Sequence, residues 1–438
     1  MLRRIIYTTI FVAALGATIA YSRGYRINIL QNEVTSNGLV AATSTPKSAK
    51  IYIDGVLKGV TDTTLYLQPG TYTFNITKDG YFPWTKTITV KGEIVHSIDA
   101  ILYPTNSSLT PLTNIGIMKA IRFGVGEQKA LIFSKKMIQK DPTSTPTPTG
   151  SSNDEPKDGL FVFDPNVRAV TLFSSLISIA DYSSFPVEIN PDNVEVIFSP
   201  NFEQAIIINM DEGQFADWNK IKRLSSDFSP DGSYPQSYTS AYLISLSNNN
   251  PSPLDVTDSA PTLLNAWTQK KLTNLNSLLS AYKKPLNHYF AENTVLLDFS
   301  QDKNRVLYIA TAEASLQKIL KEPLIGSNQT TDVREVKPNN LYVYDIKEDR
   351  NYRIFDEKEL TTHDSKQIFF HPNSKNIVFK NSDSIAIADY DAKNIQNLYS
   401  GPFNKDFLAI SNDGRLIILT NLNPTQNTYG DLYAIGIK

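Results

Sequence analysis

The sequence predicts a mainly β protein in three parts: a hydrophobic N-terminal helix, a small β-sandwich, and an array of antiparallel sheets interrupted by one helix. The chain contains 22 Tyr and 21 Phe beside many Thr, Ser and Asn, a composition that favours strands and turns. Short segments of alternating apolar and polar residues are separated by turn residues, as expected of strands with one buried face. From about residue 109 onward, two apolar segments around a polar turn recur, which indicates a repeat architecture.

The N-terminal helix is predicted from a hydrophobic run without charge that begins at Ile5 and ends at Tyr21. Its length lies at the short end of the roughly 17–25 residues that cross a bilayer as a helix. Arg3 and Arg4 precede the run, and positive residues tend to stay in the cytoplasm. We therefore expect a single-pass membrane protein whose N-terminus is cytoplasmic and whose other domains are exported.

Two other interpretations of residues 1–22 remain open. In the first, the run is a secretory signal cleaved after the small residues Thr18 and Ala20, although Thr-Ile-Ala is a mediocre cleavage sequence. The mature protein would then be secreted. In the second, the run is a buried helix of a soluble domain. Residues 23–38 are polar and show no sustained period, so we expect them to form a short stalk.

The composition excludes several kinds of chemistry. At 438 residues the chain is long enough for two or more domains. Its 42 basic and 44 acidic residues give a net charge of −2, so we expect no nucleic-acid partner. The chain has no cysteine, which excludes disulfides, thiol catalysis and cysteine-ligated metals. Stability is therefore expected to come from packing.

Residues 39–104 have the pattern of a small domain of short strands. Ile51 and Ile53 alternate with polar neighbours, which places both isoleucines on one face of a strand. Asp54 and Gly55 then supply the positive φ angles of a tight hairpin turn. Later Pro-Gly and Lys-Asp-Gly turns separate further strands, so the segment holds about six or seven strands and is predicted to be a β-sandwich.

The same segment follows the residue order of a known family. The matching residues are Ser44-Thr45-Pro46-Lys47-Ser48-Ala49, Ile51-Tyr52-Ile53-Asp54-Gly55 with Gly59 and Thr61, Leu67-Gln68-Pro69-Gly70-Thr71-Tyr72, and Gly80-Tyr81 with Trp84. Together they resemble a PEGA domain, although the Pro-Glu-Gly-Ala that names the family reads Pro-Lys-Ser-Ala here. The resemblance implies a spacer or adhesive element of prokaryotic surface proteins, without catalytic residues. We expect Tyr72, Tyr81 and Trp84 to be core residues rather than a ligand-stacking platform.

After residue 105 the chain repeats an apolar strand, a tight polar turn and a second apolar strand. The repeated turns are Phe198-Ser199-Pro200-Asn201, Phe299-Ser300-Gln301-Asp302, Phe370-His371-Pro372-Asn373 and Ile410-Ser411-Asn412-Asp413-Gly414. Phe370 and Ile410 are forty residues apart, which is the length of one β-propeller blade. Residues 105–438 therefore resemble a β-propeller of the WD-repeat or TolB-like kind.

The predicted propeller has five to six blades. Five repeat units are clear, and the insertions leave room for a sixth. The five units begin near Ile121, Val194, Asn293, Lys366 and Phe407. Residues 431–437 form the last strand. We expect this strand to pair with residues 109–112, because a ring that leaves strand edges unpaired invites aggregation.

Two loop-like insertions interrupt the repeats. Residues 141–158 have a Thr-Pro-Thr-Pro core and almost no apolar residue, so we expect a disordered excursion within one blade that proteases cut first. Residues 324–338 are a weaker case of the same kind. The Ser-Pro-Asp-Gly sequence at residues 229–232 lacks a clean strand after it, and we interpret it as a loop.

A third insertion, residues 261–283, is predicted to be an amphipathic helix that begins with a proline. Its apolar stripe recurs at three- and four-residue steps and contains Leu264, Trp267, Leu275, Leu278 and Tyr282. The helix is expected to pack on the propeller, and it is also the best candidate for a partner-docking element. Trp267 and Tyr282, at the margin of the stripe, are the predicted partner-binding residues.

The sequence carries no local catalytic signature. Nucleotide-binding, zincin and α/β-hydrolase motifs are absent. The four histidines show no metal spacing, and His371 stands at the Ser position of a turn. Two acid pairs, Asp298 with Asp302 and Asp389 with Asp391, lie at strand ends where turn chemistry explains them. We therefore predict no catalytic, cofactor-binding or metal-binding residue, and no cofactor.

Two classes of function remain. The first is a tethered binding scaffold, in which the small domain is a spacer or adhesive element and the propeller binds a protein or a cell-envelope polymer. The second is an exported propeller enzyme that acts on polysaccharide or peptide. Clustered charged residues around a central pocket would favour the enzyme, whereas a broad apolar or aromatic surface would favour a partner. We expect the scaffold, and not an enzyme.

Overall fold

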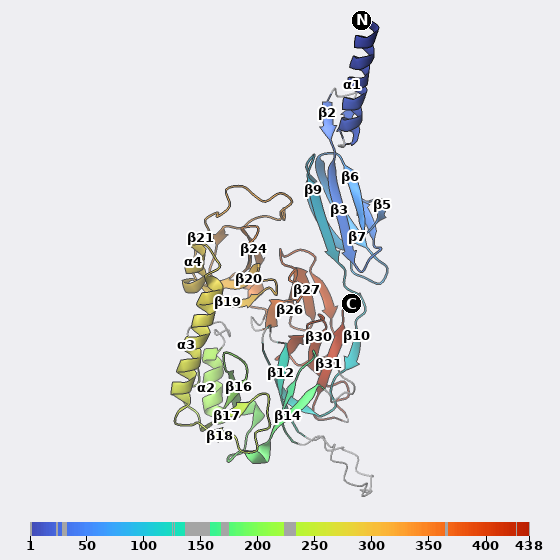
Figure 1. Ribbon diagram of the computed structural model, residues 1–438. Helices are drawn as coiled ribbons and strands as arrows, with labels where there is room; N and C mark the ends of the chain where they lie inside the picture. The colour runs from blue at the N-terminus through green and yellow to red at the C-terminus, as the bar shows by residue number, and fades with distance from the viewer. Residues whose placement is uncertain are drawn as a thin grey trace. The chain divides into compact units, whose positions relative to one another are not determined.

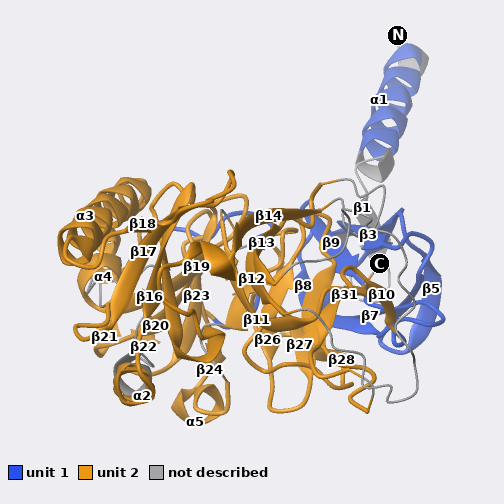
Figure 2. Cartoon of the chain, turned by 90° about the horizontal axis from the view of Figure 1, so that it is seen from below, with its two compact units in different colours: residues 1–106, 320–331, 438 blue, residues 107–319, 332–437 orange. Residues whose placement is uncertain are grey.

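The computed structural model divides the chain into two compact units (Figure 1). The described residues are 2–22, 25–28, 33–124, 126, 128–135, 158–167, 175–222, 234–363, 367–425 and 427–437. Unit 1 comprises residues 1–106 and Leu320–Thr331, and unit 2 comprises Ser107–Ile319 and residues 332–437 (Figure 2).

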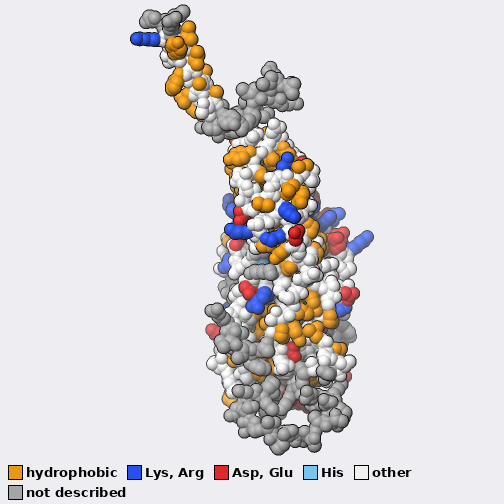
Figure 3. Space-filling view, turned by 90° about the vertical axis from the view of Figure 1, so that its right-hand side faces the viewer, with side chains coloured by type: hydrophobic (Ala, Val, Ile, Leu, Met, Phe, Trp, Pro, Cys, Tyr) orange, Lys and Arg blue, Asp and Glu red, His pale blue; other side chains and the backbone are white. Residues whose placement is uncertain are grey.

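The chain begins with helix α1 (Leu2–Ser22). Apolar side chains of this helix are exposed, as Figure 3 shows: Ile5, Ile6, Ile10, Phe11, Val12, Leu15 and Ile19. In the segment predicted as a stalk, β1 (Tyr25–Asn28) and β2 (Glu33–Ser36) pair antiparallel. Among the described residues, no helix combines the length and the apolar character needed to cross a membrane.

The rest of unit 1 is built around a sandwich of seven strands in two sheets, as the sequence predicted. The three-stranded sheet has the order β6-β3-β9 and the four-stranded sheet the order β5-β4-β7-β8. The strands are β3 (Gly38–Thr45), β4 (Lys50–Ile53), β5 (Val56–Val60), β6 (Thr63–Leu67), β7 (Gly70–Thr77), β8 (Trp84–Val90) and β9 (Val95–Ile101). β3 and β9 run parallel, whereas the other pairs are antiparallel.

The two sheets enclose one hydrophobic core. Ile51 and Ile53 are buried in it, as the alternation along their strand predicts, and Trp84 is also buried. Tyr72 and Tyr81 are partly buried and pack against the same cluster. The interpretation of the three aromatic residues as core is therefore confirmed.

The hairpin turn between β4 and β5 has the predicted backbone. Asp54 and Gly55 have φ angles of 48° and 82°, which match the left-handed pair that such a turn requires. The Asp54 carboxylate accepts a hydrogen bond from the backbone N–H of Thr73 at 2.9 Å. The turn is thereby tied to the neighbouring strand β7.

Unit 2 contains five four-stranded antiparallel sheets, matching the five repeat units; the described residues of unit 2 form no sixth sheet of this size. The first sheet holds β11 (Ile117–Phe123), β12 (Lys129–Ser134), β13 (Gly159–Phe163) and β14 (Leu176–Asp181). The second holds β15 (Val194–Phe198), β16 (Gln204–Asn209), β17 (Ser240–Ser245) and β18 (Leu254–Asp255). The third holds β19 (Thr294–Phe299), β20 (Arg305–Ala310), β23 (Leu341–Asp345) and β24 (Arg350–Phe355). The fourth holds β25 (Ile368–Phe370), β26 (Asn376–Lys380), β27 (Ile385–Asp389) and β28 (Gln396–Tyr399). The fifth holds β10 (Ser108–Pro111), β31 (Asp431–Gly436), β30 (Leu416–Thr420) and β29 (Leu408–Ile410).

The fifth sheet joins the two ends of unit 2. Its outermost strand, β10, precedes the other four sheets in the chain and pairs with the last strand, β31, so that Leu109 lies opposite Ile435. The predicted pairing of the last strand with residues 109–112 is therefore confirmed. The Asp431 carboxylate strengthens the junction, because it accepts hydrogen bonds from the Thr113 hydroxyl at 3.0 Å and the Ile115 N–H at 2.8 Å.

Hydrophobic clusters connect successive sheets. One cluster contains residues of the first and second sheets, another residues of the third and fourth, and another residues of the fifth and first. The fourth and fifth sheets meet through polar contacts, in which the Gln367 amide donates to the Asp406 carbonyl at 3.1 Å and the His371 ring contacts the Gly414 carbonyl at 3.3 Å.

The repeated turns share one hydrogen-bond pattern. The Ser199 hydroxyl donates to Asn201 at 2.8 Å and the Ser300 hydroxyl to Asp302 at 2.6 Å. In the fourth sheet the ring of His371 takes the place of the hydroxyl, and its Nδ1 accepts from the Asn373 N–H at 3.1 Å. The predicted turn role of His371 is confirmed. Each turn also ends on a residue with positive φ: Phe202, Lys303, Ser374 and Gly414.

The predicted helix of residues 261–283 is α3 (Ala260–Leu279), followed by a turn that contains Tyr282. It lies along the second and third sheets (Figure 1). Two helices that the sequence analysis did not predict, α2 (Glu212–Lys222) and α4 (Leu286–Glu292), pack beside it. The remaining short elements are η2 (Tyr182–Ser184), η3 (Pro191–Asn193), β21 (Ala314–Ser315), β22 (Glu335–Val336) and α5 (Glu357–Leu360).

The loop-like insertions differ in what the structure describes. Residues 141–157 and 228–232 lie outside the described residues, but β12 pairs with β13, so the chain resumes the same sheet after the first insertion. Residues 324–338 form turns and the short strand β22 rather than a disordered excursion. Part of this insertion belongs to unit 1, where the Gln329 amide accepts from the Thr89 N–H at 2.7 Å and donates to the Thr89 carbonyl at 3.0 Å. Gln329 thereby occupies backbone groups on the edge of β8.

Candidate functional site

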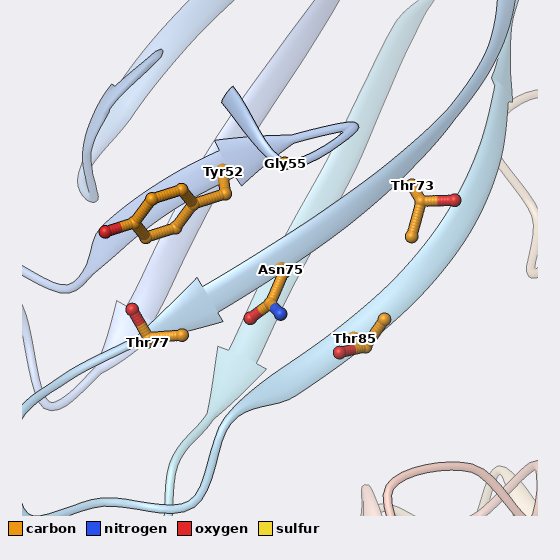
Figure 4. A pocket seen from close by; sticks show the side chains of 6 residues that line it. All are labelled: Tyr52, Gly55, Thr73, Asn75, Thr77 and Thr85. Carbon is orange, nitrogen blue, oxygen red and sulfur yellow. The ribbon is translucent and has the colours of Figure 1, made fainter. Parts of the chain in front are cut away.

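A hollow lies on the outer face of the four-stranded sheet in unit 1 (Figure 4). Its volume is about 420 Å³, and its walls are the side chains of β4, β7 and β8 together with the turn after β4. The lining residues are Tyr52, Gly55, Thr73, Asn75, Thr77 and Thr85. All six belong to the same small domain.

Strand register brings these residues together. Tyr52 lies opposite Asn75, and Asn75 lies opposite Thr85, so the three side chains form a row across the sheet. Because side chains alternate between faces, burial of the residues on either side of Tyr52 turns its ring outward. On β5, Leu57 lies opposite Tyr52 and extends the row to the edge of the sheet.

The lining offers hydroxyl and amide groups. The Thr73 hydroxyl pairs with that of Thr87 at 3.2 Å, and the Thr71 hydroxyl pairs with that of Thr89 at 3.0 Å. In contrast, the Oδ1 atom of Asn75 is covered by its surroundings and accepts no hydrogen bond from any described residue. An unsatisfied buried acceptor costs on the order of 1–3 kcal/mol, so a donor that reached Asn75 would be favoured.

Charge is absent from this lining. None of the six residues carries a charged side chain at neutral pH. Lys50, on the same strand as Tyr52, is directed to an exposed ion pair with Asp79 at 3.8 Å. The nearby edge strand β5 exposes apolar side chains beside Lys58, with Leu57 55 % exposed and Val60 52 % exposed. The site therefore combines uncharged polar groups with an aromatic ring and aliphatic side chains.

The two residues predicted to bind a partner lie in unit 2 and do not line this hollow. Trp267 is 8 % exposed and Tyr282 is 5 % exposed, so the expectation that one of them stays at an exposed margin is wrong. Trp267 packs with Trp218 of α2, and the ring of Tyr282 packs edge-on against Phe290 of α4 at 5.3 Å. Both aromatic rings are covered by helices that the sequence analysis missed.

The helix α3 also has a larger structural role than expected. Its first half, with Leu264 and Trp267, packs on the second sheet, and its second half, with Leu275 and Leu279, packs on the third. The sequence analysis expected the helix only to pack on the propeller, whereas its buried residues belong to two hydrophobic clusters of unit 2. It supplies the apolar contact between two successive sheets.

Charged residues occur on the first strands of the sheets in unit 2. The guanidinium of Arg122 on β11 lies over the ring of Phe369 on β25, 4.6 Å from its centre. Asp298 on β19 is partly buried, and its two carboxylate oxygens accept from the backbone N–H groups of Phe299 at 2.7 Å and Phe370 at 2.8 Å. Burial raises the pKa of Asp298 to about 6, against the effect of these hydrogen bonds and Arg122.

Of the predicted acid pair Asp298 and Asp302, only Asp302 is a turn residue. Asp302 accepts from Ser300 and Asn304 within its turn, as predicted, whereas Asp298 connects β19 to β25 of the next sheet. The interpretation of Asp298 as a turn acid is therefore wrong. In the second pair, Asp389 accepts from the Asn394 amide at 2.7 Å within its turn. The described residues contain no group of three or more His, Asp or Glu placed to hold a metal ion.

The sequence analysis missed the hollow, although a signal for it exists. Thr71, Thr73, Asn75 and Thr77 alternate along one strand, and Thr85, Thr87 and Thr89 alternate along the next. We interpreted this alternation only as a solvated face. The opposition of Tyr52, Asn75 and Thr85 depends on pairing between separate strands, which alternation within one strand does not determine.

Comparison with known proteins gives one family match within unit 1 and several solved structures of low similarity. Residues 37–106 match the PEGA domain, and no curated protein sequence matches the chain. A structure described as TolB from Agrobacterium tumefaciens is 11 % identical with a TM-score of 0.20, over 67 % of this chain and 66 % of that one. The β-propeller domain of the Trilobed protease from Pyrococcus furiosus is 9 % identical with a TM-score of 0.20, over 94 % and 88 %. A Trichoderma reesei carbohydrate-active enzyme of family AA12 is 7 % identical with a TM-score of 0.23, over 77 % and 97 %.

Proposed function

We propose that this chain is a membrane-anchored binding scaffold that works outside the cytoplasm. The observation that carries the proposal is the PEGA-type sandwich, which holds an uncharged hydroxyl-lined hollow on its outer face. A preformed concave site on which polar groups converge is a usual place for a ligand. In this proposal the sandwich attaches to a component of the cell envelope, and unit 2 is the larger body that it displays.

The proposed anchor is α1. Its apolar side chains are exposed along its length, and the run between Ile5 and Tyr21 contains no charge. In water such a surface is unfavourable, whereas a bilayer covers it. The arginines at positions 3 and 4 support a cytoplasmic N-terminus, and in this proposal both units lie outside.

We also propose that the five sheets of unit 2 are the blades of a closed five-bladed propeller. Every successive pair of sheets has its own contact, including the pair joined by α3 and the pair of the fifth and first sheets. Pairing of β10, the first strand of unit 2, with β31, its last strand, completes the fifth sheet. Completing a sheet in this way leaves no unpaired end for another molecule to join.

The proposal includes no catalytic residue. Asp298 on β19 is an acidic residue and Arg122 on β11 a basic residue, each on the first strand of its sheet. The contacts that each side chain makes within the fold account for its presence there. The oxygens of Asp298 accept two backbone N–H groups, and Arg122 lies on the ring of Phe369. A general base needs a free lone pair directed at a substrate, so these contacts favour a structural role.

The test of this function is fractionation of native membranes. Carbonate washing should leave the full-length chain in the membrane pellet, and N-terminal sequencing should give an uncleaved start. After detergent extraction, the intact protein should co-sediment with purified cell-envelope material. A soluble mature chain that begins near Tyr21 would overturn the anchor, and failure to co-sediment with any envelope fraction would overturn the scaffold.

A further inference from the structure

We propose that the hollow of Tyr52, Asn75 and Thr85 binds a neutral polysaccharide. This inference rests on the proposed scaffold function and names the class of ligand that the small domain would hold.

The absence of charge selects against ionic ligands. Burying a charged group without a partner is costly, and the lining offers no side chain to neutralise one. Anionic polymers, nucleic acids and acidic peptides therefore gain nothing from this surface. A ligand rich in hydroxyl groups can exchange its hydrogen bonds with water for hydrogen bonds with threonine and asparagine at little net cost.

Asn75 provides the specific polar contact. Its Oδ1 atom is covered and accepts no hydrogen bond from the described residues, and it lies between Tyr52 and Thr85 in the row across the sheet (Figure 4). A hydroxyl group that enters the hollow donates to this oxygen once the Asn75 amide turns its Oδ1 atom toward the hollow. The gain exceeds that of an ordinary exposed hydrogen bond, because it removes the penalty of an unsatisfied buried acceptor.

Tyr52 and Leu57 provide the apolar contact. Sugar rings carry hydroxyl groups at their edges and C–H groups on their faces, so they fit surfaces that mix hydrogen-bonding and apolar groups. Tyr52 is half-buried and presents an amphipathic ring. Leu57, opposite it, leaves more than half of its surface exposed, and exposed apolar groups beside a polar site are typical of binding surfaces.

The shape suits a polymer rather than an enclosed small molecule. The lining residues lie on the open face of three neighbouring strands, so a chain can continue past the hollow in either direction. A volume of about 420 Å³ lies within the roughly 300–1,000 Å³ of typical ligand sites. The hollow therefore holds a short stretch of a longer glycan.

Affinity electrophoresis of the full-length, detergent-solubilised protein tests this inference. The gels contain one neutral glycan each, hydroxyethyl cellulose, dextran or galactomannan, and matched gels contain polygalacturonate as the anionic comparison. At least one neutral glycan should retard the wild type more than polygalacturonate does. Tyr52→Ala and Asn75→Leu should each weaken that retardation about tenfold, which corresponds to about 1.4 kcal/mol.

Two further variants separate loss of binding from loss of folding. Tyr52→Phe keeps the ring and should retain most of the binding. Thr64→Ala, at an exposed position on β6 of the other sheet, should bind like the wild type. Thermal midpoints near that of the wild type show that the variants are folded. If Asn75→Leu unfolds the domain, Thr85→Val replaces it, since this change removes only the hydroxyl from the row.

The possible results separate this inference from the scaffold proposal. No retardation by any neutral glycan, or equal retardation of the wild type and all hollow variants, overturns the polysaccharide site. If the protein nevertheless co-sediments with cell-envelope material, the scaffold stands and its attachment lies elsewhere, for instance on a protein partner. If envelope binding is absent while glycan binding is present, the proposed function fails and the ligand class stands.

Discussion

Asp298 shows how one side chain can hold two sheets together. Its carboxylate extends from β19 to the backbone N–H of Phe370 on β25, so a hydrogen bond crosses between the third and fourth sheets. The same burial that makes this contact strong raises the pKa of Asp298 to about 6. A structural contact of this kind has a consequence for stability that can be measured as a function of pH.

We predict that Asp298 makes the protein less stable as the pH rises from 4 to 7. In the unfolded chain an aspartate titrates at about 3.9, so between that value and 6 the folded state binds the extra proton. The stabilisation from this extra proton is fully present below pH 4. It is lost as the pH passes 6, which lowers the free energy of unfolding by up to about 3 kcal/mol. Asp298→Asn lacks the titration, so chemical unfolding at pH 4, 5, 6 and 7 should show the wild type losing stability relative to the variant.

Asp302 is the matched control for this prediction. Burial opposes its ionisation, but hydrogen bonds from Ser300 and Asn304 outweigh burial and lower its pKa. Its contribution to stability is therefore present above the unfolded pKa and is lost as the pH falls. Asp302→Asn should show the opposite trend with pH. If the two variants show the same trend, the description of Asp298 is wrong.

Helix α3 shows how an insertion can become part of a core. It enters between the second and third sheets and covers apolar side chains of both. Sequence periodicity predicted the helix and most of its buried stripe. It could not predict that Trp267 is covered, because the cluster that encloses Trp267 includes Trp218 of another helix, whose own apolar pattern is weak. Burial of a margin residue depends on what the rest of the chain places beside it.

We predict that Trp267→Ala destabilises unit 2 substantially. The change removes a large side chain from a packed cluster, which typically costs on the order of 3–5 kcal/mol. A thermal midpoint measured by circular dichroism should fall by several degrees. Gln269→Ala, at an exposed position on the same helix, should leave the midpoint nearly unchanged. An unchanged midpoint for Trp267→Ala would mean that the helix does not pack as described.

Strand β31 carries a carboxylate that ties it to the segment after β10. Replacing Asp431 by Ala should leave the Ile115 N–H and the Thr113 hydroxyl without the acceptor they have now. The expected cost is on the order of 2–3 kcal/mol, because buried donors would be left unsatisfied. Denaturant titration checks this value. Asp383→Ala removes a carboxylate that is 86 % exposed and pairs with Lys405, so it should have little effect; equal effects of the two changes would contradict the proposed junction.

At the scale of the whole molecule, the sequence predicted repeated features better than features that arise once. The five repeat units and the sandwich follow from alternation and turn residues that recur along the chain. The pairing of the last strand with residues 109–112 follows from the expectation that a repeat array leaves no strand edge unpaired. The hollow was not predicted, because it depends on register between β4, β7 and β8. Long-range register brings together residues that are unremarkable in their own strands, such as Tyr52 and Asn75.

The central claim is that both units lie outside the cytoplasm, where the small domain can meet the cell envelope. The chain has no cysteine, so a single introduced cysteine reports the side of the membrane on which it lies. Ser97→Cys in unit 1 and Thr425→Cys in unit 2 are at exposed positions. A membrane-impermeant maleimide should label both variants in intact native cells, while a cytoplasmic cysteine protein stays unlabelled. Labelling of these variants only after the cells are permeabilised would contradict the account.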